Sequence, residues 1–185
     1  MKTGQVGGGG LHVAITGARR VHVGDVEATL RAVREASGGL TFQLFDAAAV
    51  AGWRHLFHAA VNAVNAVENG FAVSKGLDVE TLLYASCHDQ ISRAFKAMGV
   101  SKDTRDVAVL VFGEDSEAAS AEAQRIAGTL GEEDDEVLQM DEAKQRRLMK
   151  TFNVSKAALD SVGGDPREAL TSLIIEAGAL LSLRR

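Results

Sequence analysis

The chain has 185 residues, of which 46% are hydrophobic and 24% are charged, and its formal net charge is −5. This composition is typical of a globular protein, and the single proline gives no sign of a linker between two domains. The acidic net charge argues against indiscriminate nucleic-acid binding but allows a local basic patch. The sequence has one cysteine, no signal-peptide pattern and no run of about 18 apolar residues. We therefore expect a cytoplasmic protein without a membrane segment.

The first third of the chain predicts two strands and one helix. Gly7–Gly10 is a tetraglycine, so we expect residues 1–10 to be a flexible N-terminus and residues 11–185 to form a single domain. Residues 11–15 alternate and predict a strand. A helix follows at 26–36, with Asp25 as its N-cap and Gly38-Gly39 at its end, and 41–45 is rich in strand-forming residues.

The remainder predicts one more strand among several helices. The clearest helix starts at Trp53, places Leu56, Phe57, Ala60, Val61, Val64 and Val67 on one apolar stripe, and ends at Gly70. Helices capped at Asp78 and near Asp89 follow, the second with Ile91, Ala94, Phe95 and Met98 expected inward. Residues 107–112 suit a strand buried on both faces. Further helices are expected at 116–130, 141–152, 156–162 and from Asp165-Pro166 onwards.

These elements predict an α/β fold: a single domain with a mixed sheet of about four strands covered by several helices. The acidic run at 132–136 lies between two predicted helices, and we expect it to be a solvated loop.

Polar side chains gather on one side of the helix that starts at Trp53. They fall within an arc of about 80° at ~100° per residue, and they are His55, His58, Asn62, Asn65 and Asn69. The arc is either an ordinary exposed helix face or a polar binding surface. A metal site at His55 and His58 would need further ligands, because structural zinc takes four and catalytic zinc three.

No pattern in the sequence indicates catalysis. Gly7–Gly10 lacks the preceding strand and the Gly-Lys-Ser/Thr ending of a phosphate loop. Cys87 and His88 are adjacent, and adjacent helical residues do not face each other, so a buried structural thiol is favoured over a nucleophile with its base. We therefore expect a protein that binds partners, with no enzymatic activity, cofactor, metal or small-molecule substrate.

Residues 82–94 place two short helices at a polar corner. Lys75, Gln90, Arg93 and Lys96 could line one basic patch there, with Tyr84 nearby. Cations beside amides and hydroxyls suit a phosphate backbone and unstacked bases.

Three segments resemble a known family. They are Val50-Ala51-Gly52-x-x-His55-Leu56, Leu82-Leu83-Tyr84-Ala85-Ser86 with Gln90-Ile91 and Ala94, and Leu173-Ile174-Ile175-Glu176 with Ala179-Leu180-Leu181. The pattern is similar to that of the kinase-binding subunit of the KEOPS complex, the TPRKB-like or PRPK-binding protein family. The chain differs from it at Cys87, where the family usually has glycine, and at Asp89, where it usually has arginine.

The resemblance implies a non-catalytic accessory subunit. It would bind the KEOPS kinase/ATPase subunit and tRNA, through the three-prime CCA tail, within a complex that installs threonylcarbamoyladenosine. On this basis we assign tRNA binding to His55, Asn65, Lys75, Gln90, Arg93 and Lys96. The last helices are amphipathic, so we place the kinase-binding surface at Leu148, Phe152, Leu170 and Leu173.

Two other functions stay open from the sequence. One is a regulatory protein-interaction module without RNA binding, and the other is a small metal-dependent enzyme that uses His55 and His58. Binding to purified tRNA separates the first from an RNA-binding subunit, and metal analysis of untagged protein tests the second.

Overall fold

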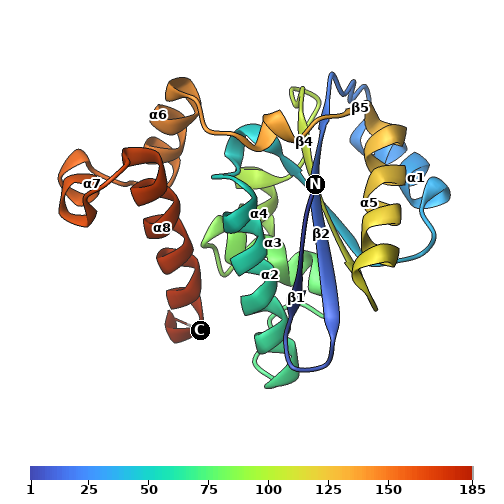
Figure 1. Ribbon diagram of the computed structural model, residues 1–185, viewed down its shortest axis with the longest axis horizontal. Coiled ribbons are helices and arrows are strands. Elements are labelled where there is room, and N and C mark those ends of the chain that lie inside the picture. The colour runs from blue at the N-terminus through green and yellow to red at the C-terminus, as the bar shows by residue number, and fades with distance from the viewer. Residues whose placement is uncertain (185) are drawn as a thin grey trace.

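Five strands and eight α-helices make up residues 1–184, the part of the chain that the computed structural model describes (Figure 1). In chain order they are β1 (Lys2–Val6), β2 (Leu11–Arg19), α1 (Val26–Ala36), β3 (Phe42–Asp46), α2 (Trp53–Glu68), α3 (Leu77–Ser86), α4 (Ile91–Met98), β4 (Val107–Gly113), α5 (Ser116–Leu130), β5 (Glu132–Glu133), α6 (Glu142–Thr151), α7 (Lys156–Val162) and α8 (Pro166–Ala179). Three 3-10 turns are η1 (Ala47–Ala49), η2 (Asp135–Leu138) and η3 (Leu180–Arg184).

The strands form one open sheet in the order β1-β2-β4-β3, with β5 paired to the far end of β2. The predicted α/β domain is confirmed, but every described strand pair is antiparallel, so the expectation of a mixed sheet is wrong. All seven residues of β4 are buried, as its apolar run predicted. Helices cover both faces of this central strand, so it is buried on both sides without being parallel to its neighbours.

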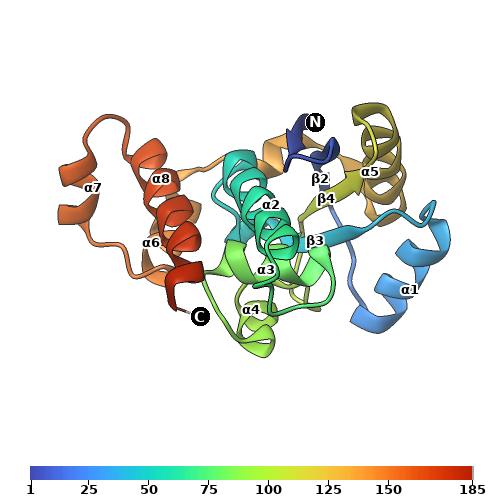
Figure 2. The same ribbon diagram turned by 90° about the horizontal axis from the view of Figure 1, so that it is seen from below.

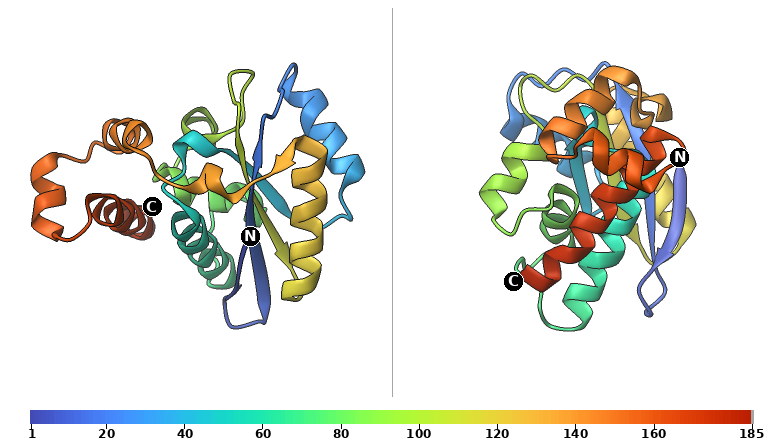
Figure 3. Two further views of the ribbon diagram at one scale, coloured as in Figure 1. Left: turned by 45° about the horizontal axis from the view of Figure 1, so that its top comes forward. Right: turned by 90° about the vertical axis from the view of Figure 1, so that its left-hand side faces the viewer.

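Helices lie in layers on either side of the sheet (Figures 1 and 2). Helix α5 packs on β2 and β4, with α1 beside it, whereas α2 and α3 pack on the opposite face. Helices α6, α7 and α8 lie farther out, beyond α2, where α8 packs against α2 (Figure 3). Within residues 1–184 no helix has both the length and the apolarity to cross a bilayer.

The first strand was not expected. We predicted a flexible segment at residues 1–10, but Lys2–Val6 pairs along β2 from Lys2↔Ile15 to Val6↔Leu11, and Val6 is 1% exposed. Gly7 and Gly10 have φ values of 69° and 80°, which glycine adopts at low cost. The tetraglycine is therefore the turn of a β-hairpin.

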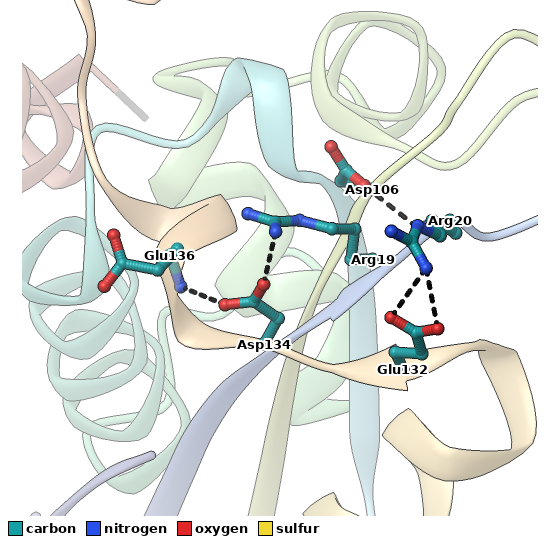
Figure 4. A network of polar contacts seen from close by, with 6 residues as sticks. All are labelled: Arg19, Arg20, Asp106, Glu132, Asp134 and Glu136. Atoms are coloured by element: carbon teal, nitrogen blue, oxygen red, sulfur yellow. Dashed lines mark hydrogen bonds and ion pairs between the residues drawn. The ribbon is translucent and has the colours of Figure 1, made fainter.

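The acidic run at 132–136 is tied to the sheet as β5 and η2, so the expectation of a loop is wrong, although Glu132, Glu133 and Glu136 are exposed to solvent as expected. Arg19 pairs with Asp134 at 2.7 Å and Arg20 with Glu132 at 2.9 Å (Figure 4). The Thr16 hydroxyl donates to Asp135 at 2.8 Å. Arg19 at the end of β2 and Arg20 directly after it thus hold β5 and η2 against the sheet.

Candidate functional site

The turn between α3 and α4 is the centre of the predicted binding surface. Helix α3 ends in Cys87, which has a left-handed backbone with φ 56° and ψ 26°, and the His88 N–H donates to Leu83 O at 3.2 Å. A side chain in this conformation costs about 1 kcal/mol relative to glycine, so glycine is the favoured residue there. The departure from the family pattern at Cys87 therefore falls on a position where the backbone itself favours glycine.

Cys87 is a structural thiol in this turn. Its Sγ lies 3.7 Å from Ile174 O on α8. Burial raises the pKa of the Cys87 thiol to about 11, so the reactive thiolate is scarce at neutral pH. The geometry supports the structural interpretation of Cys87.

Helix α4 presents a mixed cationic and apolar surface. Gln90, Arg93 and Lys96 are exposed, as is Lys75 in the loop before α3. No ion pair found within residues 1–184 involves Lys75, Arg93 or Lys96, so these charges face solvent.

The inward face of α4 is narrower than predicted. Ala94 and Met98 are fully buried as expected, but Ile91 and Phe95 are 42% and 44% exposed. The expectation that these two point into the core is wrong, because α4 packs mainly on α3 and buries only Ala94 and Met98. The exposed surface of α4 therefore carries the apolar side chains of Ile91 and Phe95 beside the cations.

His55 is not on the surface, and its assignment to tRNA binding is wrong. The side chain is 2% exposed, Nδ1 accepts from the Ala51 N–H at 3.1 Å, and Nε2 donates to Ala85 O at 2.8 Å. Burial lowers the pKa of His55 to about 4, so the ring is neutral at pH 7.

These two hydrogen bonds also remove His55 as a metal ligand, because neither ring nitrogen is free in this arrangement. Among the described residues no three His, Cys, Asp or Glu side chains are grouped as a metal site requires. His58 is half-buried, and its pKa is lowered by burial and by the nearby Arg54 guanidinium.

The other end of the polar arc does reach solvent. Asn65 and Asn69 are exposed, and the Asn69 side chain donates to Asn65 O at 2.7 Å. Helix α3 packs against both α2 and α4, so Asn65 and the α4 side chains belong to different helices of one layer (Figure 2). No hydrogen bond joins the described side chains of Asn65 and Arg93.

The residues assigned to kinase binding lie mostly inside a third hydrophobic cluster. Leu148 and Leu170 are 0% exposed and pack with Leu159 and Ile174, so these two positions are wrong as surface contacts. Phe152 and Leu173 are half-buried at the margin of the same cluster. The apolar stripes of α6 and α8 face each other and α7, and are therefore not left uncovered.

Exposed apolar side chains occur instead at the end of α8. Leu180 is 46% exposed and Leu183 is 79% exposed on η3. Arg184 lies on the same turn, donates to Ala177 O at 3.1 Å, and acts electrostatically on the Cys87 thiol. Sequence reasoning missed Arg184 as part of the corner, because the packing of η3 beside the end of α3 has no local signal.

Comparison with known proteins gives two matches. The family model described as "Kinase binding protein CGI-121" matches residues 22–182. The regulatory protein Cgi121 of Methanocaldococcus jannaschii is 32% identical over 116 residues, which cover 63% of this chain and 72% of that protein. The family match includes α2, the α3–α4 corner and α8, together with β3, β4 and β5, whereas β1 and β2 precede it.

Proposed function

This chain belongs to the CGI-121 family of kinase-binding proteins, and we propose that it is a non-catalytic accessory subunit of the KEOPS complex in the cytoplasm. It binds the KEOPS kinase/ATPase subunit and recruits tRNA through the three-prime CCA tail, in support of threonylcarbamoyladenosine synthesis. The observation that carries the proposal is the family match over residues 22–182.

A regulatory role without catalysis fits the chemistry of the described residues. The thiol of Cys87 has a raised pKa, and both nitrogens of His55 are engaged in structural hydrogen bonds. The M. jannaschii relative is itself named a regulatory protein. The purified chain should not hydrolyse ATP. Steady ATP turnover that co-elutes with the pure monomer would contradict this part of the proposal.

The kinase-binding surface is assigned to the outer end of α8 and η3. Leu180 and Leu183 are exposed there, and half-buried Leu173 lies on the same helix. Exposed leucines bury apolar area in a partner without first opening the core, at about 25 cal/mol per Å². This replaces Leu148 and Leu170, which stabilise the α6–α8 cluster.

The test is co-elution with the kinase subunit. Leu183→Glu should keep the fold, since the side chain is 79% exposed, and should abolish a stable complex. Val162→Glu is the matched control: Val162 is 48% exposed on α7, away from η3, and the variant should bind like wild type. Equal co-elution of both variants would move the surface elsewhere.

The tRNA surface is assigned to the α3–α4 corner. The exposed side chains there are Gln90, Arg93, Lys96 and Lys75. Arg184 adds a cation from η3, and Asn65 lies on α2, which packs on the other side of α3 from α4. A single-stranded tail offers phosphates to the cations and free base edges to the amides. Because the protein is net acidic, about two to four phosphates would be engaged, with a salt slope of about −0.7 per phosphate.

A gel shift of intact against tail-trimmed tRNA at fixed salt tests this assignment. Arg93→Glu should weaken binding of intact tRNA, and so should removal of the CCA tail. Arg31→Glu, a charge reversal at an exposed position on α1 across the sheet, is the control and should bind like wild type. Equal binding of both tRNAs would rule out tail recognition and favour the second candidate, a regulatory module without RNA binding.

A further inference from the structure

Strand β3 is an edge of the sheet, because it pairs with β4 on one side only. Thr41 O accepts from the Phe112 N–H at 2.8 Å, and the Ala47 N–H donates to Asp106 O at 3.0 Å. In an antiparallel pair such bonds alternate along the strand, so the odd-numbered residues between them bond to β4. The peptide groups of Phe42 and Leu44 therefore point away from the sheet.

Residues of this edge, Phe42, Gln43 and Leu44, line a groove of about 660 Å³. One wall comes from α1, with Val26, Leu30 and Arg34, and the other comes from the start of α3 and from α4. The second wall contributes Lys75, Leu77, Val79, Phe95 and Val100. The half-exposed ring of Phe95, unexplained by packing in the core, belongs to this wall.

One of the outward peptide groups is covered by a side chain. Gln43 Nε2 donates to Leu44 O at 2.9 Å, and Gln43 is 8% exposed. The amide occupies the position that the N–H of an adjacent strand would take. Gln43 thus shields the edge in the free protein, as edge strands commonly need.

We propose that the edge of β3 that pairs with no other strand binds an extended peptide segment of a partner protein, which displaces the Gln43 amide from Leu44 O, adds a strand to the sheet and carries apolar and acidic side chains. An extended residue occupies roughly 160 Å³, from a rise of ~3.3 Å, a strand spacing of ~4.8 Å and a sheet separation of ~10 Å. The groove therefore holds about four residues, close to the length of β3. Main-chain bonds supply the affinity, and the two apolar walls select the side chains.

The charge of the groove favours an acidic partner. Arg34 and Lys75 stand on opposite walls, neither is in a described ion pair, and Asp78 is the single acidic side chain in the lining. The groove shares Lys75 with the proposed tRNA surface, but the peptide proposal depends on neither the kinase role nor the tRNA role.

The experiment is selection of random nine-residue displayed peptides against the full chain, followed by amide exchange with a selected peptide. Selected peptides should be free of proline and alternate apolar with acidic residues. They should slow exchange at the Phe42 and Leu44 amides at least tenfold. Arg34→Glu with Lys75→Glu should weaken binding about tenfold, whereas the control Arg31→Glu should leave it unchanged.

N-methylation of the peptide separates strand addition from other binding. Methylating the peptide amides that face β3 should abolish binding, and methylating the alternate amides should not. Peptides that bind equally after both changes, or a selection that yields none protecting Phe42 and Leu44, would overturn the proposal. Protection of the same amides by single-stranded RNA would also overturn the proposal, because the groove would then bind RNA. The same holds if these amides become protected as the protein forms a dimer, detected by light scattering at rising protein concentration.

Discussion

His55 makes a pH-dependent contribution to stability that can be isolated with one substitution, His55→Gln. The imidazole joins the start of α2 to the end of α3, through Ala51 and Ala85, at 3.1 and 2.8 Å. It accepts one of these hydrogen bonds, which only the neutral ring can do. Protonation in the folded state is therefore opposed by both burial and the loss of that bond.

The magnitude follows from the pKa, which falls from 6.5 to about 4 on folding. The folded pKa is depressed, so the unfolded chain binds the proton more readily, and stability is full above pH 6.5 and is lost as the pH falls towards 4. Each unit is worth 1.36 kcal/mol. At pH 5 the loss is about 2 kcal/mol relative to pH 8, and near pH 4 it approaches about 3 kcal/mol.

Urea unfolding at pH 8 and pH 5 measures this loss. His55→Gln lowers stability at pH 8 by about 1–3 kcal/mol, because buried partners are left imperfectly paired. Its further loss between pH 8 and pH 5 should be smaller than that of wild type by about 2 kcal/mol. Leu83→Ala, which is destabilising without a titratable group, is the control and should keep the wild-type pH dependence. An unchanged pH dependence in His55→Gln would refute the assignment.

Three further predictions concern the core and the corner. Leu83→Ala should lower the free energy of unfolding by about 2–5 kcal/mol in urea, because Leu83 of α3 is fully buried in the main hydrophobic cluster. Leu148→Glu should unfold the α6–α8 cluster, seen as lost protease resistance, since it buries an unpaired charge, whereas Lys150→Glu, an exposed change on the same helix, should not. Asp89→Arg should tighten tRNA binding in the gel shift by a few-fold, because Asp89 is exposed beside Gln90; weaker binding would contradict the assigned surface.

The helices were predictable wherever capping and periodicity agreed. Asp25 accepts from the Ala28 N–H at 2.7 Å, and Asp165 caps α8 through the Arg167 and Glu168 amides, as the sequence indicated. Both signals are local, because the cap and its partner lie within three residues of each other. β1 carries no comparable signal, since its stability depends on pairing with β2.

The candidate site was less predictable, because a helical wheel shows which residues share a face but not what that face meets. His55 belongs to a polar arc in sequence, yet its partner Ala85 lies 30 residues away and the arc is buried at this end. Leu148 belongs to an amphipathic stripe that α7 and α8 cover. In each case a contact between distant segments decides whether the side chain is available to a partner.

The same contacts explain what the family pattern does and does not determine. Ala85 accepts from His55 of α2, Cys87 lies against Ile174 of α8, and a Cβ at Gly178 would come within 2.8 Å of Tyr84 O. The three segments that carry the family resemblance therefore meet at one junction, and most of their side chains are buried there. The resemblance thus specifies the framework that fixes the α3–α4 corner, whereas affinity for a ligand depends on exposed neighbours such as Asp89 and Arg93. An acidic residue at position 89 can accordingly change binding at this corner while the fold beneath it stays the same.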